Sequence, residues 1–281
     1  MKIPPLLLLI CLFSVPVLAQ QDSSKRTTLT LAALYNSNVS YYGQTTSEKL
    51  PYVLANATLR LPVGLYFSAG AYKLLNYGSG ISETDLGLGY DYDINEKWSA
   101  GIAYTRSFFP DNSPLLQAAN ENNINLSATY LWPWLKTYLS ADYAFGKQQD
   151  VFLSLTNSKE ISLGSLFNEK NAIYIEPAIE LIAGTRHFYE TYTIEKGKRD
   201  QARGKGKPPV NQPGKPGSTI TTTVATDSFN LLSYNFKLPL SLSRANYIAE
   251  ASYQLSVLGT ESGPELKPQQ SFFGFAFYYQ F

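Results

Sequence analysis

The sequence predicts a closed antiparallel β-barrel of about twelve strands that crosses a membrane. Three observations predict it. Apolar and polar residues alternate with a period of two in segment after segment, which separates the two faces of a strand. Many of these segments reach about ten residues, the length that a tilted strand needs to cross a bilayer. Short turns also alternate with longer connections, as they do in membrane barrels.

The composition favours strands over helices. Of 281 residues, 44% are hydrophobic, 14% aromatic and 16% charged, which excludes a disordered chain. The chain has 21 Tyr and 15 Phe but one Cys and one Met, a balance typical of half-buried sheet surfaces. With 23 basic and 22 acidic residues, the formal net charge is only +1, and loss of Lys2 with a signal peptide would bring it to zero. No net charge then draws the chain to nucleic acid, and we expect no nucleic-acid partner.

The first nineteen residues read as a cleaved signal peptide. Lys2 gives the positive start, 6–13 the apolar centre, and 17–19 the small-residue site that signal peptidase recognises. We therefore expect a signal peptide over 1–19 and one barrel domain over 20–281. Cleavage would remove Met1 and Cys11, so the mature chain would form no disulfide and offer no thiolate to a metal.

Alternation is cleanest between 85 and 94, where every even position is apolar and every odd position is Asp or Gly. Similar splits run through 124–132, 135–145, 173–181 and 247–255. With the less regular segments added, the expected strands are 27–38, 51–61, 65–75, 85–94, 98–109, 124–132, 135–145, 151–163, 173–181, 229–242, 247–255 and 270–281.

Two segments depart from simple alternation. The eighth strand must continue through Ile161 and Leu163 and bend near Gly164, or the barrel has ten strands instead. The face that is apolar switches near Asn235, which indicates a bulge. Pro177 and Pro239 each remove a hydrogen-bond donor from the ladder, so we also expect them at bulges.

The connections are of two kinds. Short turns are expected at 62–64, 95–97, 133 and 243–245, and longer stretches at 39–50, 76–83, 108–121, 187–227 and 259–269. Trp98, Trp132 and Trp134 lie beside short turns, where an aromatic girdle at the periplasmic interface requires amphipathic rings. The connection at about 187–227 includes a basic, Pro- and Gly-rich stretch at 196–217, which we expect to be mobile and outside.

The last strand carries an unbroken aromatic face that ends on the terminal residue: Phe273, Phe275, Phe277, Tyr279 and Phe281. This strand resembles the C-terminal strand of bacterial outer-membrane β-barrel proteins, a porin-like class. A Gln directly after the expected cleavage site, here Gln20, resembles the start of many mature envelope proteins of the Bacteroidota. No specific family is matched. The resemblance implies an outer-membrane location with periplasmic termini, insertion by the barrel-assembly machinery, and contact with outer-membrane lipid and lipopolysaccharide.

If the apolar faces meet lipid, the polar faces point into the lumen. The charged residues expected there are Arg60, Asp91, Asp93, Lys136, Asp142, Glu176, Glu180 and Glu250. Their acidic excess indicates a pore or pocket for cations or polar neutral solutes, and a salt-bridge network around Arg60 and Lys136 is the open alternative. Inward Tyr52, Tyr138 and Tyr174 predict a narrow or partly plugged lumen.

Enzymatic chemistry finds little support. The single histidine, His187, has no Asp or Ser at a spacing typical of a catalytic group, and one His without a mature Cys disfavours zinc. We expect no catalytic residue, cofactor or metal. The expected function is a narrow channel for small polar solutes or ions. A non-conducting structural or binding barrel that presents its loops is the alternative, followed by a soluble secreted β-sandwich. The oligomeric state stays open.

Overall fold

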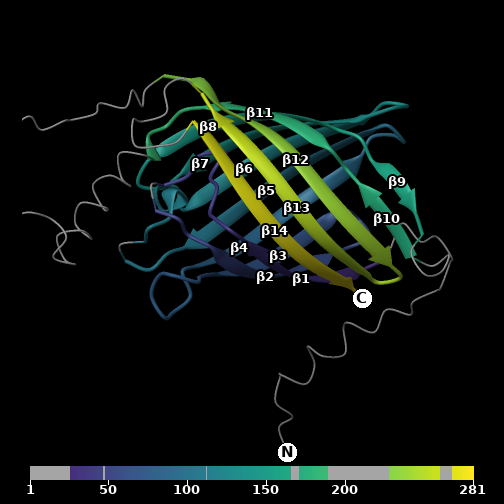
Figure 1. The fold of residues 1–281 in the computed structure, drawn as a ribbon, viewed down its shortest axis with the longest axis horizontal. Coiled ribbons are helices and arrows are strands. Elements are labelled where there is room, and N and C mark those ends of the chain that lie inside the picture. The colour runs from purple at the N-terminus through teal and green to yellow at the C-terminus, as the bar shows by residue number, and fades with distance from the viewer. Residues whose placement is uncertain (1–25, 47, 112, 166–170, 189–227, 260–267) are drawn as a thin grey trace, which may run out of the picture.

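The computed structural model describes residues 26–46, 48–111, 113–165, 171–188, 228–259 and 268–281, which form a closed barrel (Figure 1). The expected signal peptide and the basic stretch at 196–217 lie outside these residues. Among the elements that lie wholly within the described residues, the one helix is the one-turn 3₁₀ helix η3 (Leu116–Ala119). None of the described helical structure is long and apolar enough to cross a bilayer.

Fourteen strand segments form one antiparallel sheet, in which β1 pairs with β14 and closes the ring. They are β1 (Thr28–Asn36), β2 (Tyr52–Arg60), β3 (Leu65–Leu74), β4 (Glu83–Asp93), β5 (Trp98–Phe108), β6 (Asn122–Leu131), β7 (Lys136–Phe145), β8 (Gln149–Ser158), β9 (Ile161–Gly164), β10 (Asn171–Ile175), β11 (Ala178–Gly184), β12 (Asn230–Arg244), β13 (Tyr247–Leu258) and β14 (Gln269–Gln280). Because β8 with β9, and β10 with β11, are each one interrupted strand, the wall has twelve strands, and the predicted fold class and strand number are confirmed.

The interruptions face one another in the wall. Pro177 lies in the gap between β10 and β11, and its carbonyl accepts the Lys159 amide at 3.2 Å. Pro239 is not at a bulge, contrary to expectation. It lies in the unbroken β12 where the partner changes from β11 to β10, and its carbonyl accepts the Glu176 amide at 3.2 Å. Because Pro239 lies opposite the interruption between β10 and β11, its missing N–H removes no hydrogen bond from the ladder there.

The bulge expected near Asn235 lies slightly earlier in the chain. Ser233 and Leu231 are partners of Ile182 and Ala183, which are adjacent in β11, so Leu232 is the extra residue. This bulge turns Leu232 inward next to the equally buried Ser233.

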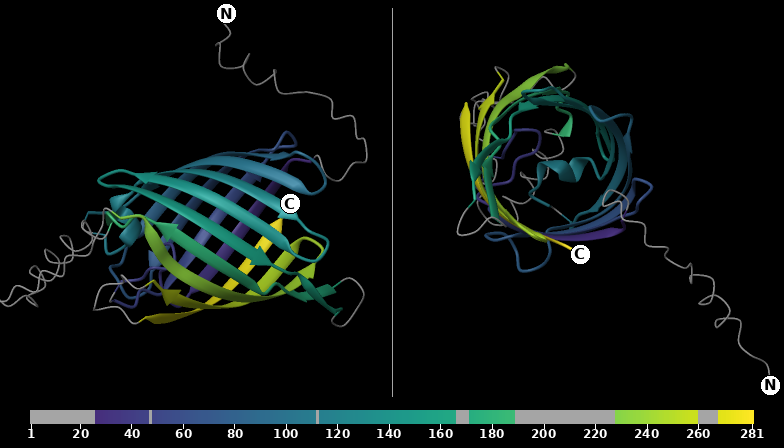
Figure 2. Two further views of the ribbon diagram at one scale, coloured as in Figure 1. Left: turned by 90° about the horizontal axis from the view of Figure 1, so that it is seen from above. Right: turned by 90° about the vertical axis from the view of Figure 1, so that its right-hand side faces the viewer.

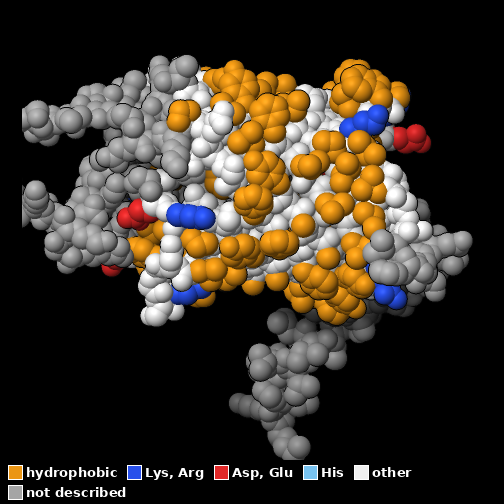
Figure 3. Space-filling view, viewed as in Figure 1, with side chains coloured by type: hydrophobic (Ala, Val, Ile, Leu, Met, Phe, Trp, Pro, Cys, Tyr) orange, Lys and Arg blue, Asp and Glu red, His pale blue; other side chains and the backbone are white. Residues whose placement is uncertain are grey.

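The outer wall is apolar on every strand. Large exposed side chains cover it, with Leu86 57% and Phe275 60% exposed, and Figure 3 shows the resulting apolar surface. One representative from each wall strand is Leu31, Val53, Phe67, Leu86, Ile102, Leu126, Leu139, Leu153, Ile179, Phe236, Tyr253 and Phe275. So much exposed apolar surface is characteristic of a wall that faces lipid.

The two ends of the barrel differ. At the short-turn end the chain reverses through 61–64, 94–97, 132–135 and 245–246, and the first and last strands meet there, where the Phe281 amide donates to the Leu29 carbonyl at 2.9 Å. At the long-loop end the connections are longer, with one exception. Strands β7 and β8 are joined by 146–148 alone, which agrees with the short gap between the expected strands at 135–145 and 151–163.

Candidate functional site

Three segments from the long-loop end fold into the barrel. They are 37–51 after β1, 113–121 before β6 and 185–188 after β11, and we call their described residues the plug. Viewed along the barrel, segments of the first two, including η3, lie within the ring (Figure 2). The plug therefore narrows the lumen at one end.

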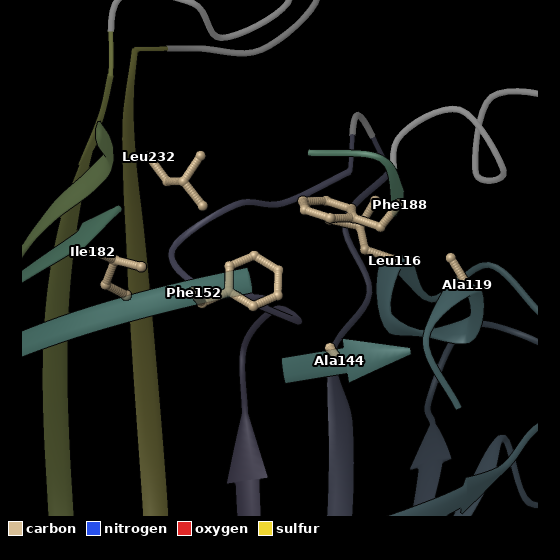
Figure 4. Close-up of a cluster of buried hydrophobic side chains, with 7 residues drawn as sticks. All are labelled: Leu116, Ala119, Ala144, Phe152, Ile182, Phe188 and Leu232. Carbon is tan, nitrogen blue, oxygen red and sulfur yellow. The ribbon is translucent and has the colours of Figure 1, made fainter. Parts of the chain in front are cut away.

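A hydrophobic cluster fixes the plug to the wall. Leu116 and Phe188 of the plug are fully buried against Phe152, Ile182 and Leu232, which point inward from β8, β11 and β12 (Figure 4). The burial of large apolar side chains contributes about 1.5–3 kcal/mol each. The cluster thus joins the plug to three strands of the wall.

Two tyrosines of the plug complete this cluster. The Tyr42 ring stacks on Phe152 with centroids 3.6 Å apart, and Tyr41 meets Phe188 edge-on at 5.1 Å. Burial raises the pKa of both tyrosine hydroxyls well above the usual value, so both stay neutral at physiological pH. A second cluster joins Val39, Leu50 and Leu115 of the plug to Leu74 of β3.

Asp150, near the long-loop end of β8, is the polar anchor of the plug. One carboxylate oxygen accepts the Asn120 side-chain amide at 2.9 Å and the Phe188 amide at 3.0 Å. The other accepts the Thr185 hydroxyl at 2.7 Å and the His187 amide at 2.8 Å, and lies 3.1 Å from His187 Nδ1. With Asp150 1% exposed, these donors replace the water that a carboxylate requires.

Sequence reasoning missed Asp150 because its partners are 30 to 38 residues away. It looked for an acid close to His187, whereas the pairing of β8 with β11 brings the two side chains together. The signal that could have found Asp150 was the alternation of inward and outward residues along the strand. Val151 and Leu153 point outward, so Asp150 had to point inward at the end of its strand.

Two glycines permit close approach of the plug to the wall. Gly43 has φ +78°, and a Cβ there would lie 2.0 Å from Ser233 Oγ. A Cβ on Gly146 would lie 2.8 Å from the Glu121 amide nitrogen. The turn after Gly146 also holds the plug directly, because the Lys147 amide donates to the Ala119 carbonyl at 2.8 Å.

Below the plug, three polar cavities follow one another along the lumen. The upper cavity, about 350 Å³, lies against the plug, the middle cavity is about 340 Å³, and the mouth cavity, about 460 Å³, lies toward the short-turn end. Lys237 lines both the upper and the middle cavity, and Thr129 and Tyr138 line both the middle and the mouth cavity. The shared residues place neighbouring cavities side by side, and we call the three cavities together the lane.

Many charges of the lane are paired with one another. Arg60 Nη1 lies 2.6 Å from Asp91 Oδ2 at the mouth cavity, which Asp93 also lines. Lys136 Nζ lies 2.5 Å from Glu176 Oε1 at the middle cavity. Pairs of this kind are the salt-bridge arrangement that the sequence left as an alternative to an acidic pore.

A further pair includes a residue that sequence analysis did not select. Lys237 Nζ lies 2.8 Å from Glu180 Oε2, and its place between outward Phe236 and Leu238 was the signal that it points inward. Asp142 and Glu250 are bonded to neutral donors instead. Asp142 accepts the side-chain amides of Asn123 at 2.9 Å and Asn125 at 2.8 Å, and Glu250 accepts the Ser241 hydroxyl at 3.2 Å.

The three tryptophans gather at the short-turn end on the outside. Trp98 and Trp132 flank Tyr130, each with its ring centroid 4.6 Å away, and Trp134 is 64% exposed. The indole N–H of Trp132 donates to Thr137 Oγ1 at 3.0 Å. Among the described residues, no group of three His, Cys, Asp or Glu side chains is arranged to hold a metal ion.

No family model matches the sequence, and no curated protein is significantly similar to it. Solved structures are similar in fold. The KdgM porin aligns at 10% identity over 90% of this chain and 99% of its own, with a TM-score of 0.46. An outer membrane channel from Pseudomonas putida F1 aligns at 13% identity over 92% and 96%, TM-score 0.47. LpxR from Salmonella typhimurium aligns at 9% identity over 90% and 99%, TM-score 0.49.

These three TM-scores lie below 0.5, so the fold of this protein is assigned from its own strands, faces and connections. Twelve antiparallel strands close into a ring that is apolar outside and polar inside, with short turns at one end and longer connections at the other. The protein therefore has the fold of the outer-membrane β-barrels.

Proposed function

We propose that the protein is a narrow channel of the bacterial outer membrane, which passes small polar solutes or ions along the lane and is restricted by the plug. The observation that carries this proposal is the succession of three cavities along the lumen, in which neighbouring cavities share Lys237, or Thr129 and Tyr138, in their linings. A barrel built only as a scaffold has no need for open polar space below its plug. Side chains fill the lumen of eight-stranded barrels, whereas barrels of sixteen or more strands leave an aqueous channel, and twelve strands lie between these sizes.

In the proposed orientation, the short-turn end faces the periplasm with both termini, and the long-loop end faces outward. Trp98, Trp132 and Trp134 then form the periplasmic aromatic girdle. Exposed Leu86 and Phe275 contact lipid acyl chains. In this proposal His187 and Asp150 hold the plug and have no catalytic step.

Planar-bilayer recording tests the proposal. Purified protein whose folding is verified by heat-modifiable migration on gels is expected to give discrete conductance steps. The matched comparison is a plug variant, Leu116→Ala, which removes a fully buried contact and is expected to raise the open probability. Silence from both well-folded proteins would reject the channel.

A second candidate is a non-conducting barrel that presents its loops to lipopolysaccharide or a protein partner. The two hydrophobic clusters favour it, because they seal the plug to the wall around much of its edge. In that case conductance is absent, and deletion of 196–217 abolishes surface binding while the barrel still migrates as a folded protein.

A further inference from the structure

The mouth cavity has equal numbers of basic and acidic side chains, and each lysine of the middle cavity is paired with a carboxylate. The mouth cavity is lined by two basic side chains, Arg26 and Arg60, and two acidic ones, Asp91 and Asp93. Lys136, Glu176 and Lys237 line the middle cavity, where Lys136 is paired with Glu176. Lys237 is paired with Glu180, which lines the upper cavity. A solute with net charge gains little from such a lining and must compete with ion pairs that are already formed. The balance favours an uncharged solute.

Neutral hydrogen-bonding groups fill the space between these pairs. Ser99, Asn125, Ser127 and Thr129 line the mouth cavity, and Thr129 continues into the middle cavity with Thr156 and Ser158. Hydroxyl and amide groups both donate and accept hydrogen bonds. They therefore match a solute that carries many hydroxyl groups, each of which is also donor and acceptor.

Tyr138 lies at the junction of the two cavities. Its neighbours across β6 and β8 are the small residues Thr129 and Thr156. Tyr66, in contrast, is covered, because the Arg60 guanidinium lies over its ring at 4.9 Å and its ring lies against Gly89. Tyr138 is thus the aromatic surface available to the C–H face of a solute.

We propose that Tyr138 and its two cavities form a binding site for small uncharged polyhydroxylated solutes, of the size of a monosaccharide or disaccharide. The proposal rests on the channel function and names its substrate class. Volumes of about 460 and 340 Å³ are within the range of sites for small ligands. The hydroxyls bind the Ser, Thr and Asn groups, and the Arg60–Asp91 pair offers a donor and an acceptor side by side.

Current block by sugar tests this site in the full-length protein. Added sucrose is expected to reduce the ion current through the open channel reversibly, with an effect that saturates. Tyr138→Ala is expected to raise the sucrose concentration that gives half-maximal block about fivefold to tenfold. Tyr138→Phe keeps the ring and is expected to keep most of the affinity for sucrose. Tyr104→Ala is the matched control, because Tyr104 is exposed on the outer wall and its loss leaves the block unchanged.

Three results separate this proposal from the channel function. A channel that conducts but shows no saturable block by sucrose, or the same block in Tyr138→Ala, overturns the sugar site alone. So does a reversal potential in a KCl gradient that shows strong cation selectivity.

If no conductance is found, calorimetric titration of the folded barrel with sucrose decides the site independently of transport. Binding that Tyr138→Ala weakens supports the site, and the absence of binding rejects it. Should Tyr138→Ala fail to fold, Thr129→Val removes a hydroxyl shared by both cavities and is expected to weaken binding severalfold.

Discussion

The side-chain amide of Asn120 donates a 2.9 Å hydrogen bond to the buried carboxylate of Asp150, and so joins η3 to the wall of the barrel. The same carboxylate binds the chain at 185–188. Two of the three segments that narrow the lumen therefore depend on one acidic side chain. Asp150 therefore holds both segments against the wall.

Replacement of Asp150 by Ala is expected to loosen the plug and raise the mean conductance, because several buried donors lose their acceptor at a cost of about 1–3 kcal/mol each. Single-channel recording measures this. Glu96→Gln, in an exposed short turn, is the control and is expected to match the unmodified protein. An unchanged current in a folded Asp150→Ala protein would show that the hydrophobic clusters alone hold the plug.

The stacked pair of Tyr42 and Phe152 gives a prediction of stability. Phe152→Ala removes a fully buried ring and is expected to lower the free energy of unfolding by about 3–5 kcal/mol. Urea titration in detergent measures the change. Phe229→Ala is the comparison, since Phe229 is 49% exposed, and its effect is expected to be much smaller. Equal losses in the two variants would contradict the role of the cluster.

The pair of Lys237 and Glu180 predicts a change in ion selectivity. Glu180→Gln leaves the ammonium group without its carboxylate, so the reversal potential in a KCl gradient is expected to shift toward anion preference. The double variant Glu180→Gln with Lys237→Met is expected to return close to the starting value, since both charges are gone. A shift in the double variant as large as that in the single one would mean that the pair does not border the path.

The close approach at Gly43 predicts a local effect of one methyl group. Gly43→Ala is expected to speed hydrogen exchange across 38–46, because the new Cβ would collide with Ser233 and the backbone is left-handed. Gly78→Ala is the control that separates backbone strain from the collision. Gly78 has a similar φ of +61° but open space around it, so it reports backbone strain without the collision. Equal effects at both positions would assign the result to strain alone.

The outer wall predicts a defect in membrane assembly. Leu86→Arg places a charge on the proposed lipid face and is expected to cost about 2–4 kcal/mol near the bilayer centre, which lowers the heat-modifiable folded fraction. Val63→Arg lies in a short turn, at a residue that is 68% exposed, and is expected to be tolerated. Normal assembly of Leu86→Arg would argue that this face does not meet hydrocarbon.

The wall of the barrel was predictable from sequence because the period of two is a local property. Alternation between 85 and 94 assigns each residue of β4 to a face without knowledge of its neighbours. The same reasoning found the extension through Ile161 and Leu163. It misjudged Pro239, because whether a missing N–H is tolerated depends on the gap in the adjacent strand, which the local sequence of β12 does not show.

The sequence by itself predicted a barrel of about twelve strands, with ten as the alternative, and it determined the inward and outward faces and the residue types that line the lumen. Only the tertiary structure decided that 37–51, 113–121 and 185–188 enter the barrel, that Asp150 binds two of them, and which lane charges are paired. The physical reason is distance along the chain. A face is set by adjacent residues, whereas a plug and its anchors are set by contacts between residues far apart in sequence, which exist only once the ring has closed.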